Sequence, residues 1–508
     1  MIEDISDLGE GTIVRGDVCV VGTGPAGMEA IRYLRRNGLS VVVAEGGRRE
    51  FSKEMQELSR VESVGRKVRE PDPHCKLTPY LAPEHRGEGR LRQLGGNSNI
   101  WTGKWREFEP LDFAPRPHVP WSGWPFGLGE LRPLYREIER DYGFGDFAAA
   151  EKKAEPFAER VESGLSLSFH YWEVAPLRTA RRHADELAGD VGIRVILGAN
   201  AIELVQEQGG TVTRLRCRSP EGREIGFEAA DFIIATGGIE VPRLLLASTA
   251  RDPRGIGNEK DLVGRYFQDH PKIKTGIFHP GPNFHLLPGG AANFPRPRFK
   301  AAVSLSPELQ AEHGLLNHTL QFAPLAPQPS GSLVGRILQR LRRRRGTDPG
   351  PGPYKASFIF EQAPNPESRV TLSDQRDMLG MRKPRLDWQL TELDTRSFDA
   401  TLALLAQQLL QAGIGRLEFS GRTPTIEDTV DCRHHIGTTR MGATPETGVV
   451  DADARVWGTD NLWIASSAVF PTGHSYGPTL TILAVTRKAC QAILRRRRVA
   501  QTAERRAV

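Results

Sequence analysis

The chain has no apolar run long enough to cross a membrane. A membrane-spanning helix needs about 20 consecutive apolar residues, and no stretch of the 508 residues approaches that length. Residues 1–11 are acidic and polar, so they also lack the apolar segment of a secretory signal. These absences predict a soluble, cytoplasmic protein without a membrane span.

Cysteine is scarce as well. The five cysteines are scattered, odd in number, and form no CxxC pair. This pattern excludes a disulfide framework and a zinc site, and the sequence shows no haem motif and no iron–sulfur spacing. A reducing compartment fits it best, and we expect no bound metal.

A large excess of charge of one sign is also missing. The 68 Lys and Arg barely outnumber the 62 Asp and Glu, and the two signs are mostly interspersed. A nucleic-acid partner is therefore not expected. The densest basic run, residues 336–345, lies in a Pro-, Gly- and Arg-rich stretch at 324–353. We interpret it as a flexible, solvated surface segment, with docking to an anionic partner or membrane surface as the alternative.

A dinucleotide-binding fingerprint stands near the start of the chain. Short apolar runs at 17–21 and 41–45 are typical of buried parallel strands, and a helical pattern separates them. Between the first run and that helix, Gly22, Gly24 and Gly27 form a GxGxxG turn. Its glycines allow the tight turn, the approach of a pyrophosphate, and close packing of helix on strand.

The residues around this turn complete the predicted site. Pro25 and Ala26 begin the helix, whose N-terminus supplies N–H donors and partial positive charge for phosphates. Glu45 ends the second strand, where its carboxylate can bind ribose hydroxyls. The fingerprint alone does not separate FAD from NAD.

The rest of the sequence predicts an α/β protein of two or three structural units. A more β-like, irregular region at 271–420 is expected to face the substrate. Further strands are predicted at 193–205, 226–235 and 461–465, and helices at 128–144, 240–248, 390–412 and 478–494.

An ordered string of motifs resembles the glucose-methanol-choline (GMC) oxidoreductases. The C-terminal part reads HHIGTTRMG at 434–442, VVD at 449–451, RVWG at 455–458, DNLWI at 460–464, VFPT at 469–472 and PTLTI at 478–482. Four earlier pieces agree, namely GGNS at 95–98, ATGGIE at 235–240, GRYFQDHP at 264–271 and NPESRV at 365–370. The resemblance extends from about residue 14 to 495.

The resemblance implies a discontinuous Rossmann-type FAD-binding domain with an inserted α+β substrate-binding domain on an antiparallel-type sheet. The FAD domain would comprise residues 14–112, 182–270 and 425–495, and the substrate domain residues 113–181 and 271–424.

The same resemblance implies FAD as the cofactor. The helix that starts at Pro478 and Thr479 would aim its N-terminus at the flavin, where a helix dipole favours negative charge. Ile100 stands where some relatives carry a histidine bonded to FAD, so we expect non-covalent binding. The other implied flavin-side contacts are Gly95, Asn97, Ser98, Asn99, Trp101, Ala235, Gly237 and Ser466.

His434 matches the catalytic histidine of the family. Hydride removal from an alcohol needs a base for the hydroxyl proton, and histidine has an unperturbed pKa of about 6.5. The family's usual second His or Asn is replaced here by Gly477. His474 and Tyr476 lie in the same loop as possible substitutes, with His474 slightly favoured.

The sequence at 90–96, 122–125 and 439–441 resembles that of the sugar-oxidising branch of the family, which includes pyranose oxidases. The implied substrate is an alcohol group of a sugar, glycoside or cyclitol, with oxygen, a quinone or a protein carrier as electron acceptor. Two alternatives stay open: a flavin-dependent lyase or photodecarboxylase on the same fold, and a non-catalytic flavoprotein that binds a partner.

Overall fold

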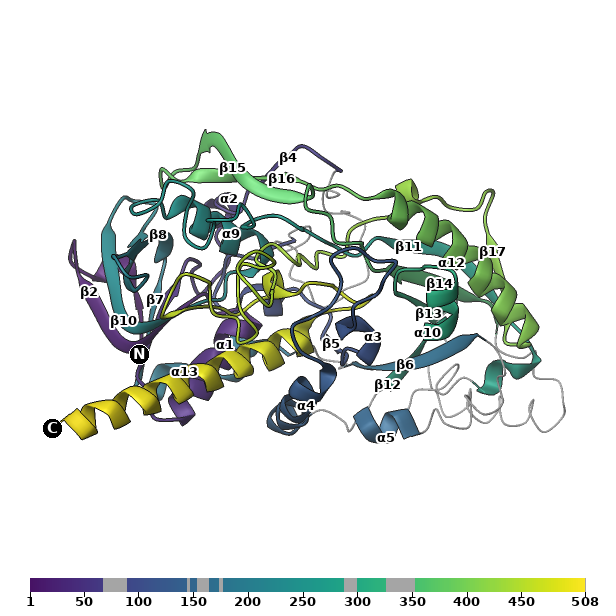
Figure 1. The fold of residues 1–508 in the computed structure, drawn as a ribbon, viewed down its shortest axis with the longest axis horizontal. Helices are drawn as coiled ribbons and strands as arrows, with labels where there is room; N and C mark the ends of the chain where they lie inside the picture. Colours follow the sequence, from purple (N-terminus) through teal and green to yellow (C-terminus); the bar gives the residue numbers. More distant parts are fainter. Residues whose placement is uncertain are drawn as a thin grey trace.

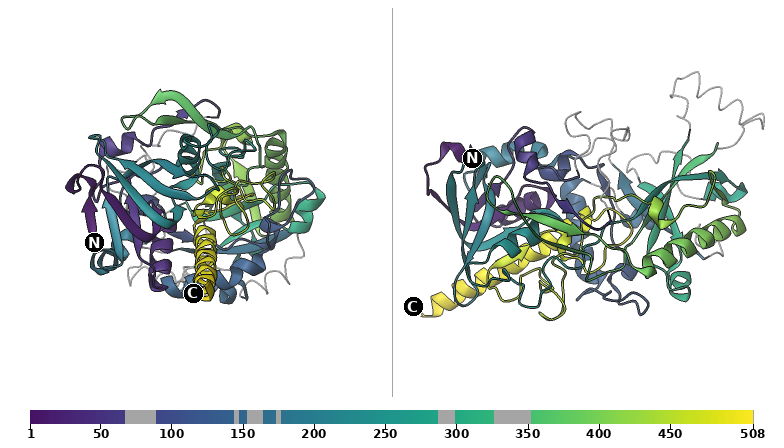
Figure 2. Two further views of the ribbon diagram at one scale, coloured as in Figure 1. Left: turned by 60° about the vertical axis from the view of Figure 1, so that its left-hand side comes forward. Right: turned by 90° about the horizontal axis from the view of Figure 1, so that it is seen from above.

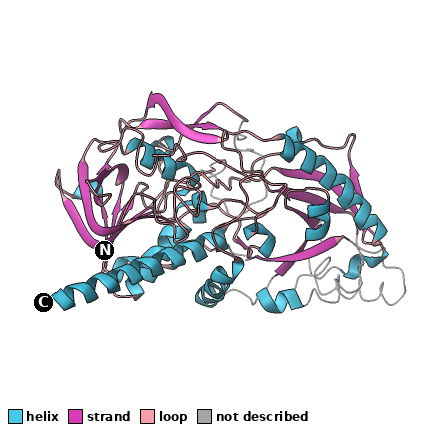
Figure 3. Ribbon diagram, viewed as in Figure 1, coloured by secondary structure: helices cyan, strands magenta, loops and turns pink. Residues whose placement is uncertain are grey.

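Two sheets stand at opposite ends of an elongated molecule, with a loop-rich zone between them (Figures 1 and 3). The computed structural model describes residues 1–66, 89–143, 147–152, 164–172, 177–286, 299–325 and 352–507. The basic run 336–345 and most of the 324–353 stretch lie outside the described residues.

The first sheet contains the dinucleotide fingerprint. Its strands follow the order β1-β7-β3-β2-β10-β9-β8, with β18 pairing beside β10. The pairs from β1 to β10 and the β10–β18 pair are parallel, whereas β8 and β9 add an antiparallel meander. The described strands are β1 (Ile2–Asp4), β2 (Ile13–Val21), β3 (Val41–Glu45), β7 (Ile193–Leu197), β8 (Asn200–Gln206), β9 (Val212–Arg218), β10 (Glu224–Ile234) and β18 (Leu462–Ile464).

The strand predicted at 193–205 is wrong as a single element. Gly198, with φ of 71°, breaks it into β7 and β8, which pair with different neighbours. An apolar run continues on both sides of the turn, so hydrophobicity alone did not reveal the break.

Three helices pack together on one side of the first sheet. α1 (Pro25–Arg36) and α4 (Leu128–Tyr142) both contact the long α13 (Thr479–Ala507), which is yellow in Figure 1. Arg487 of α13 pairs with the buried Glu29 of α1 at 2.5 Å, and Tyr142 of α4 donates to the same carboxylate. α9 (Gly237–Ala247) follows β10 and packs against β8. None of the described helices combines the length and hydrophobicity that crossing a bilayer requires.

The second sheet is antiparallel throughout its described pairs, as the sequence predicts for the substrate-facing part. Helix α12 (Glu392–Gln411) covers it, and Phe398, Leu402, Leu405 and Leu409 join the core under the sheet. Its strands, in spatial order, are β17 (Gly415–Phe419), β11 (Lys272–Pro280), β14 (Tyr354–Phe360), β13 (His318–Pro324), β12 (Phe299–Leu305), β6 (Leu165–Trp172) and β5 (Lys104–Trp105).

Two pairings cross the predicted domain boundaries. β5 falls within 14–112 but pairs with β6 of the second sheet. β15 (Arg369–Arg376) and β16 (Arg382–Asp387) form a small separate sheet with β4 (Glu62–Ser63), and this sheet contacts α9. Figure 2 shows the same division into two ends from two further directions.

The remaining described elements are short. They are the α-helices α2 (Lys53–Glu57), α3 (Pro110–Phe113), α5 (Phe147–Lys152), α7 (Thr179–Arg182), α8 (Ala184–Gly189) and α10 (Pro307–Glu312), and 3-10 helices at Ile5–Asp7, Gly96–Asn99, Pro282–Leu286, Ile426–Asp428 and Ser467–Val469. The predicted α/β class with a second antiparallel sheet is confirmed.

Candidate cofactor and active site

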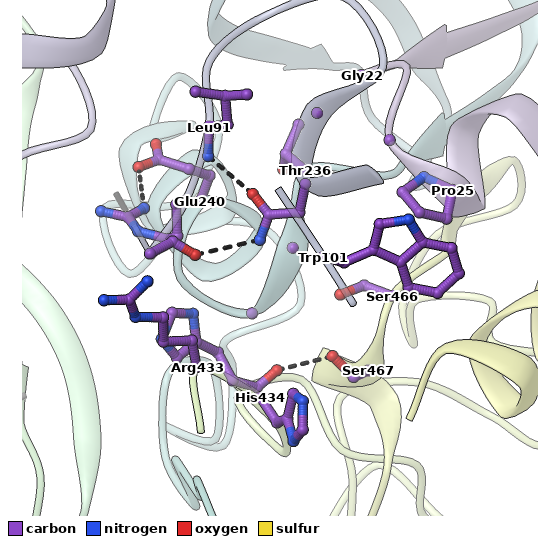
Figure 4. A pocket seen from close by; sticks show the side chains of 18 of the residues that line it. Gly22, Pro25, Leu91, Trp101, Thr236, Glu240, Arg433, His434, Ser466 and Ser467 are labelled. Atoms are coloured by element: carbon purple, nitrogen blue, oxygen red, sulfur yellow. Dashed lines mark hydrogen bonds and ion pairs between the residues drawn. The ribbon is translucent and has the colours of Figure 1, made fainter. Parts of the chain in front are cut away.

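A cavity of about 730 Å³ joins the fingerprint of the first sheet to the edge of the second. Its wall takes residues from the β2–α1 turn, the end of β3, the 89–102 loop, the start of α9, β11, the 430–435 loop and the start of α13. Figure 4 shows this cavity, with Gly22 and Pro25 near one part of it and His434 near another. Segments far apart in sequence therefore converge on one space.

The β2–α1 turn forms a cradle that only small residues fit. Gly22 has φ of 95°, and a Cβ on Gly27 would lie 2.0 Å from the Gly22 carbonyl oxygen. A Cβ on Gly24 would meet nothing within 4 Å, so this backbone faces the open cavity. Gly27 packs helix on strand and does not line the cavity. These are the roles that a pyrophosphate-binding turn requires, and the cradle fits FAD.

Glu45 lies on the cavity wall at the end of β3. Its carboxylate accepts hydrogen bonds from the backbone N–H of Thr23 (2.9 Å), the Thr23 hydroxyl (2.5 Å) and the N–H of Gly47 (2.6 Å). Burial raises the pKa of Glu45 in spite of these donors. The Thr23 hydroxyl also accepts from the Gly95 N–H at 2.8 Å. Thr23 thus connects the fingerprint to the predicted flavin loop, a role that the motif does not reveal.

The residues of the 95–101 loop divide into two groups. Asn97 and Trp101 line the cavity, as do Ile100 and Gly96. The others hold the loop from behind and are absent from the wall: the Ser98 hydroxyl donates to the Gly95 carbonyl at 2.7 Å, and the Asn99 amide donates to the Leu94 carbonyl at 2.9 Å.

The remaining predicted cofactor residues also reach the cavity. They are Pro25, Ala26, Ala235, Gly237, Ser466, Pro478 and Thr479. Pro478 immediately precedes α13, so the N-terminus of that helix opens on the cavity.

An arginine cluster near the fingerprint escaped sequence analysis. Arg90, Arg92 and Arg243 surround Glu240 at 2.7, 3.6 and 3.2 Å, and all four line the cavity. Burial alone would raise the pKa of Glu240, but the three guanidinium groups outweigh it and lower the pKa to about 2. Only pairing in the folded chain reveals this cluster, which gives the cavity wall a positive potential suited to phosphates.

His434 lines the cavity beside a second histidine. Its Nδ1 lies 2.8 Å from Nδ1 of His270, whose Nε2 lies 3.1 Å from the carbonyl oxygen of Gly473. A carbonyl only accepts, so His270 Nε2 carries the proton and donates. Burial lowers the pKa of His270 to about 3, so the ring is neutral and its Nδ1 accepts.

This relay fixes the tautomer of His434. Since His270 Nδ1 accepts, His434 Nδ1 must donate, and His434 Nε2 is left with its lone pair. A Cβ built on Gly477 would lie 3.9 Å from that Nε2. Gly477 also lines the cavity, so the basic nitrogen faces the space beside it. Burial, followed by the facing His270 and Lys272, holds the pKa of His434 well below its ordinary value. His434 is therefore an unprotonated base at neutral pH.

Asp269 holds the backbone of the His434 loop. Its carboxylate accepts N–H bonds from His270 (2.6 Å), Cys432 (3.2 Å), Arg433 (2.9 Å) and His434 (3.0 Å). Burial, opposed by N–H donors, raises the pKa of Asp269 to about 7. Arg433 adopts φ of 63° in this loop, a conformation that non-glycine residues rarely take. Asp269 and His270 both come from the 264–271 motif, which by itself does not predict these roles.

The two substitutes predicted for the missing second residue lie in different places. His474, the favoured one, is fully buried, does not line the cavity, and contacts Asp112 through Nδ1 at 2.8 Å. Tyr476 does line the cavity, and its ring packs 5.0 Å from that of His170. Burial raises the pKa of the Tyr476 hydroxyl, so it stays protonated. Next to it, Gly477 leaves space where a side chain would face His434.

Lysines line the part of the cavity contributed by the second sheet. Lys104 of β5 and Lys272 and Lys274 of β11 belong to its wall. Lys104 and Lys272 both contribute to lowering the pKa of His434, so their charges act on the candidate base. The sequence does not predict this group of lysines, because β5 and β11 are far apart in the chain and are not neighbours in the sheet.

Comparisons with known proteins agree with this arrangement. Residues 364–486 match the family model described as GMC oxidoreductase. The large subunit of fructose dehydrogenase from Gluconobacter japonicus is 26% identical, covering 94% of this chain and 97% of that protein. Paromamine 6'-oxidase from Streptomyces fradiae is also 26% identical, over 94% and 91%. The solved pyridoxine 4-oxidase from Mesorbium loti superposes with a TM-score of 0.56 at 16% identity, covering 94% of this chain and 98% of that one.

Proposed function

The chain belongs to the GMC oxidoreductases, and from this premise we propose that it oxidises an alcohol group of a sugar, glycoside or cyclitol to the carbonyl with FAD. Curated relatives named for oxidation of a sugar and an aminoglycoside, each matched over nearly the whole chain, support this substrate class. The observation that carries the proposal is the unprotonated Nε2 of His434 in the same cavity as the dinucleotide cradle.

Different parts of the cavity wall have different proposed roles. The cradle from Gly22 to Ala26, together with Glu45, would hold the ADP part of FAD, and the loop around Asn97 and Trp101 would lie against the flavin. When bound, FAD supplies the hydride acceptor for the substrate carbon. His434 Nε2 takes the hydroxyl proton as that C–H bond breaks, which leaves the carbonyl product and balances the charge.

Two neighbours prepare His434 for this step. His270 keeps the proton on Nδ1, and Asp269 fixes the loop backbone. Tyr476 lines the cavity next to Gly477 with its hydroxyl oxygen buried, and we assign this residue, rather than His474, to the place that a second His or Asn takes in relatives. The His474 ring does not line the cavity and contacts Asp112, so we assign it a structural role.

The proposal includes a division of the chain. The first sheet with its cradle forms the FAD-binding part, from residues 14–112, 182–270 and 425–495. The second sheet forms the substrate part, from residues 113–181 and 271–424, with β5 joining it.

Replacement of His434 tests the proposal. We expect His434→Ala to retain FAD and to lose roughly 10²–10⁴-fold in the rate of anaerobic flavin reduction by its substrate. The matched variant is His435→Ala, because His435 also lines the cavity but lacks the contact to His270 and packs its ring against Phe267 at 5.6 Å. Equal loss in both variants, or no loss in His434→Ala, would contradict the assignment and favour a lyase or a non-catalytic flavoprotein.

We also propose that FAD is bound without a covalent link. Ile100 lines the cavity at the position of the linking histidine in some relatives, and its hydrocarbon side chain cannot form such a bond. Precipitation of the purified protein with acid is expected to leave all yellow colour in the supernatant. Flavin that stays in the washed pellet would contradict this.

A further inference from the structure

The substrate end of the cavity carries an excess of ammonium groups. Lys104, Lys272 and Lys274 line it together with His434. Lys104 is half-buried, and its nearest hydrogen-bond contact is the side-chain oxygen of Gln321, at a long 3.4 Å. Among the described residues, no carboxylate forms an ion pair with Lys104 or Lys272.

The ammonium groups act on one another. Burial, followed by the charges of Lys272, Lys300 and Lys274, lowers the pKa of Lys104 to about 7, and Cys432 only partly opposes this. Clustered like charges in a half-buried space are unfavourable unless an anion compensates them. Such an anion would be held by several charge-assisted hydrogen bonds.

The acidic residues on this wall compensate only part of the charge. Asp428 is already paired with Arg422 in a two-point contact at 2.7 and 2.8 Å. Asp431 and Arg433 of the neighbouring loop also lie on this wall. Among the described residues of the wall, Lys104 and Lys272 are thus the two cations on which the charge argument depends.

From this wall we infer that the alcohol oxidised by this enzyme carries an anionic group, a carboxylate or a phosphate, held by Lys104 and Lys272 while its hydroxyl faces His434. The inference rests on the proposed function, because it names the substrate class of the same cavity. It also separates this chain from relatives that take neutral or cationic sugars, since a polyamine substrate would meet like charge here.

Matched sugars provide the test on the FAD-loaded protein. D-glucuronate and D-glucose 6-phosphate are compared with D-glucose and D-glucosamine under anaerobic conditions. Two quantities are measured: the dissociation constant from perturbation of the flavin spectrum, and the rate of flavin reduction. We expect one of the two anions to bind at least about tenfold more tightly than glucose, glucosamine to bind most weakly, and added salt to erode the difference. Which anion binds better distinguishes carboxylate from phosphate.

Variants assign the effect to the lysines. Lys104→Met and Lys272→Met keep the length of the side chain and remove its charge, and each should abolish most of the preference for the anion, measured as the ratio of its dissociation constant to that of glucose in the same variant. Lys260→Met is the control, because Lys260 lies outside the cavity and pairs with Glu446. Lys272 lies on a different strand from Lys104, so the test stands if one variant fails to fold.

Three outcomes overturn the inference. In the first, glucose or glucosamine binds more tightly than both anions. In the second, only neutral sugars reduce the flavin, which overturns the inference and leaves the proposed function intact. A change in FAD affinity or flavin potential in both Met variants, with unchanged sugar preference, assigns the lysines to the cofactor instead. Tight anion binding with no reduction by any alcohol would sink the proposed function but keep the anion site.

Discussion

At the residue scale, the pair formed by His270 and His434 determines which nitrogen can act as a base. A histidine that loses its hydrogen-bond partner can rotate or change tautomer, and either change removes the lone pair from the substrate. Tautomer control by a neighbouring ring is the role that we propose for the buried, neutral His270 beside the proposed base His434.

Replacing His270 tests this role. His270→Leu is expected to lower the limiting rate of flavin reduction by about 10²-fold with little change in KM, because misplaced reactive groups cost about that much. His270→Asn keeps an acceptor near the position of Nδ1 and should recover part of the rate. A fall in stability or a rise in KM, with an unchanged limiting rate, would show that His270 only supports the fold.

The spacing of Gly22, Gly24 and Gly27 predicted the cradle, because the GxGxxG motif depends only on the local backbone conformation. It could not predict Thr23, Asp269 or His270 as supports, because their contacts are made to residues 72 to 165 positions away. It also favoured His474 over Tyr476, since loop position does not say which side chain faces a cavity.

At the element scale, buried charge joins α1, α4 and α13. Glu29 and Arg487 are both almost fully buried, and Arg487 also contacts Asp141 at 2.8 Å. The start of α13 opens on the cavity, so this network also fixes the direction from which the helix meets the cofactor.

We expect Glu29→Ala to lower the free energy of unfolding by about 3–5 kcal/mol, because it leaves a buried guanidinium without its closest partner. Denaturant unfolding of the FAD-loaded protein measures this. Asp252→Ala, which breaks the exposed pair with Arg254, is the control and should leave stability unchanged. An effect of Glu29→Ala no larger than that of the control would refute the structural role of the network.

Element types were predicted more reliably than their limits. The helix predicted at 478–494 continues to Ala507, because Arg496 and Arg497 pair with Asp231, and Arg497 also contacts Asp17, beyond the apolar stripe. In the sequence, a run of arginines indicates a solvent-exposed segment. The acidic residues that pair with these arginines are far away in the chain, so only the folded structure shows them. The strand at 193–205 failed for the opposite reason, since one apolar run served two strands.

At the scale of the whole molecule, two sheets of different type meet at one cavity. The first contributes the glycine cradle proposed for the cofactor, and the second contributes the lysines proposed for the substrate. Figure 1 shows the two sheets at opposite ends of the molecule. Fold class followed from the sequence, because periodicity and motif order report on it. The charge of the cavity did not, because Lys104 and Lys272 line it from strands that are far apart in the chain and are not neighbours in the sheet.

The charge of this wall predicts a pH dependence. Since burial and neighbouring lysines lower the pKa of Lys104 to about 7, its positive charge is present below that pH and lost above it. The groups that face it are Lys272, Lys274, Lys300 and Cys432. The ratio of kcat/KM for D-glucuronate to that for D-glucose should therefore fall as pH rises from 6 to 8, and the ratio cancels effects on His434 that both sugars share. A ratio that is flat or rises would contradict the assignment of Lys104.

The visible spectrum of the purified protein tests the central claim most directly. It is recorded without oxygen before and after a pooled panel of sugars, sugar acids, glycosides and cyclitols. We expect an oxidised-flavin band that bleaches when the pool is added. A flavin band that never bleaches would contradict alcohol oxidation, and a protein that binds no flavin even when FAD is supplied would contradict the cofactor as well.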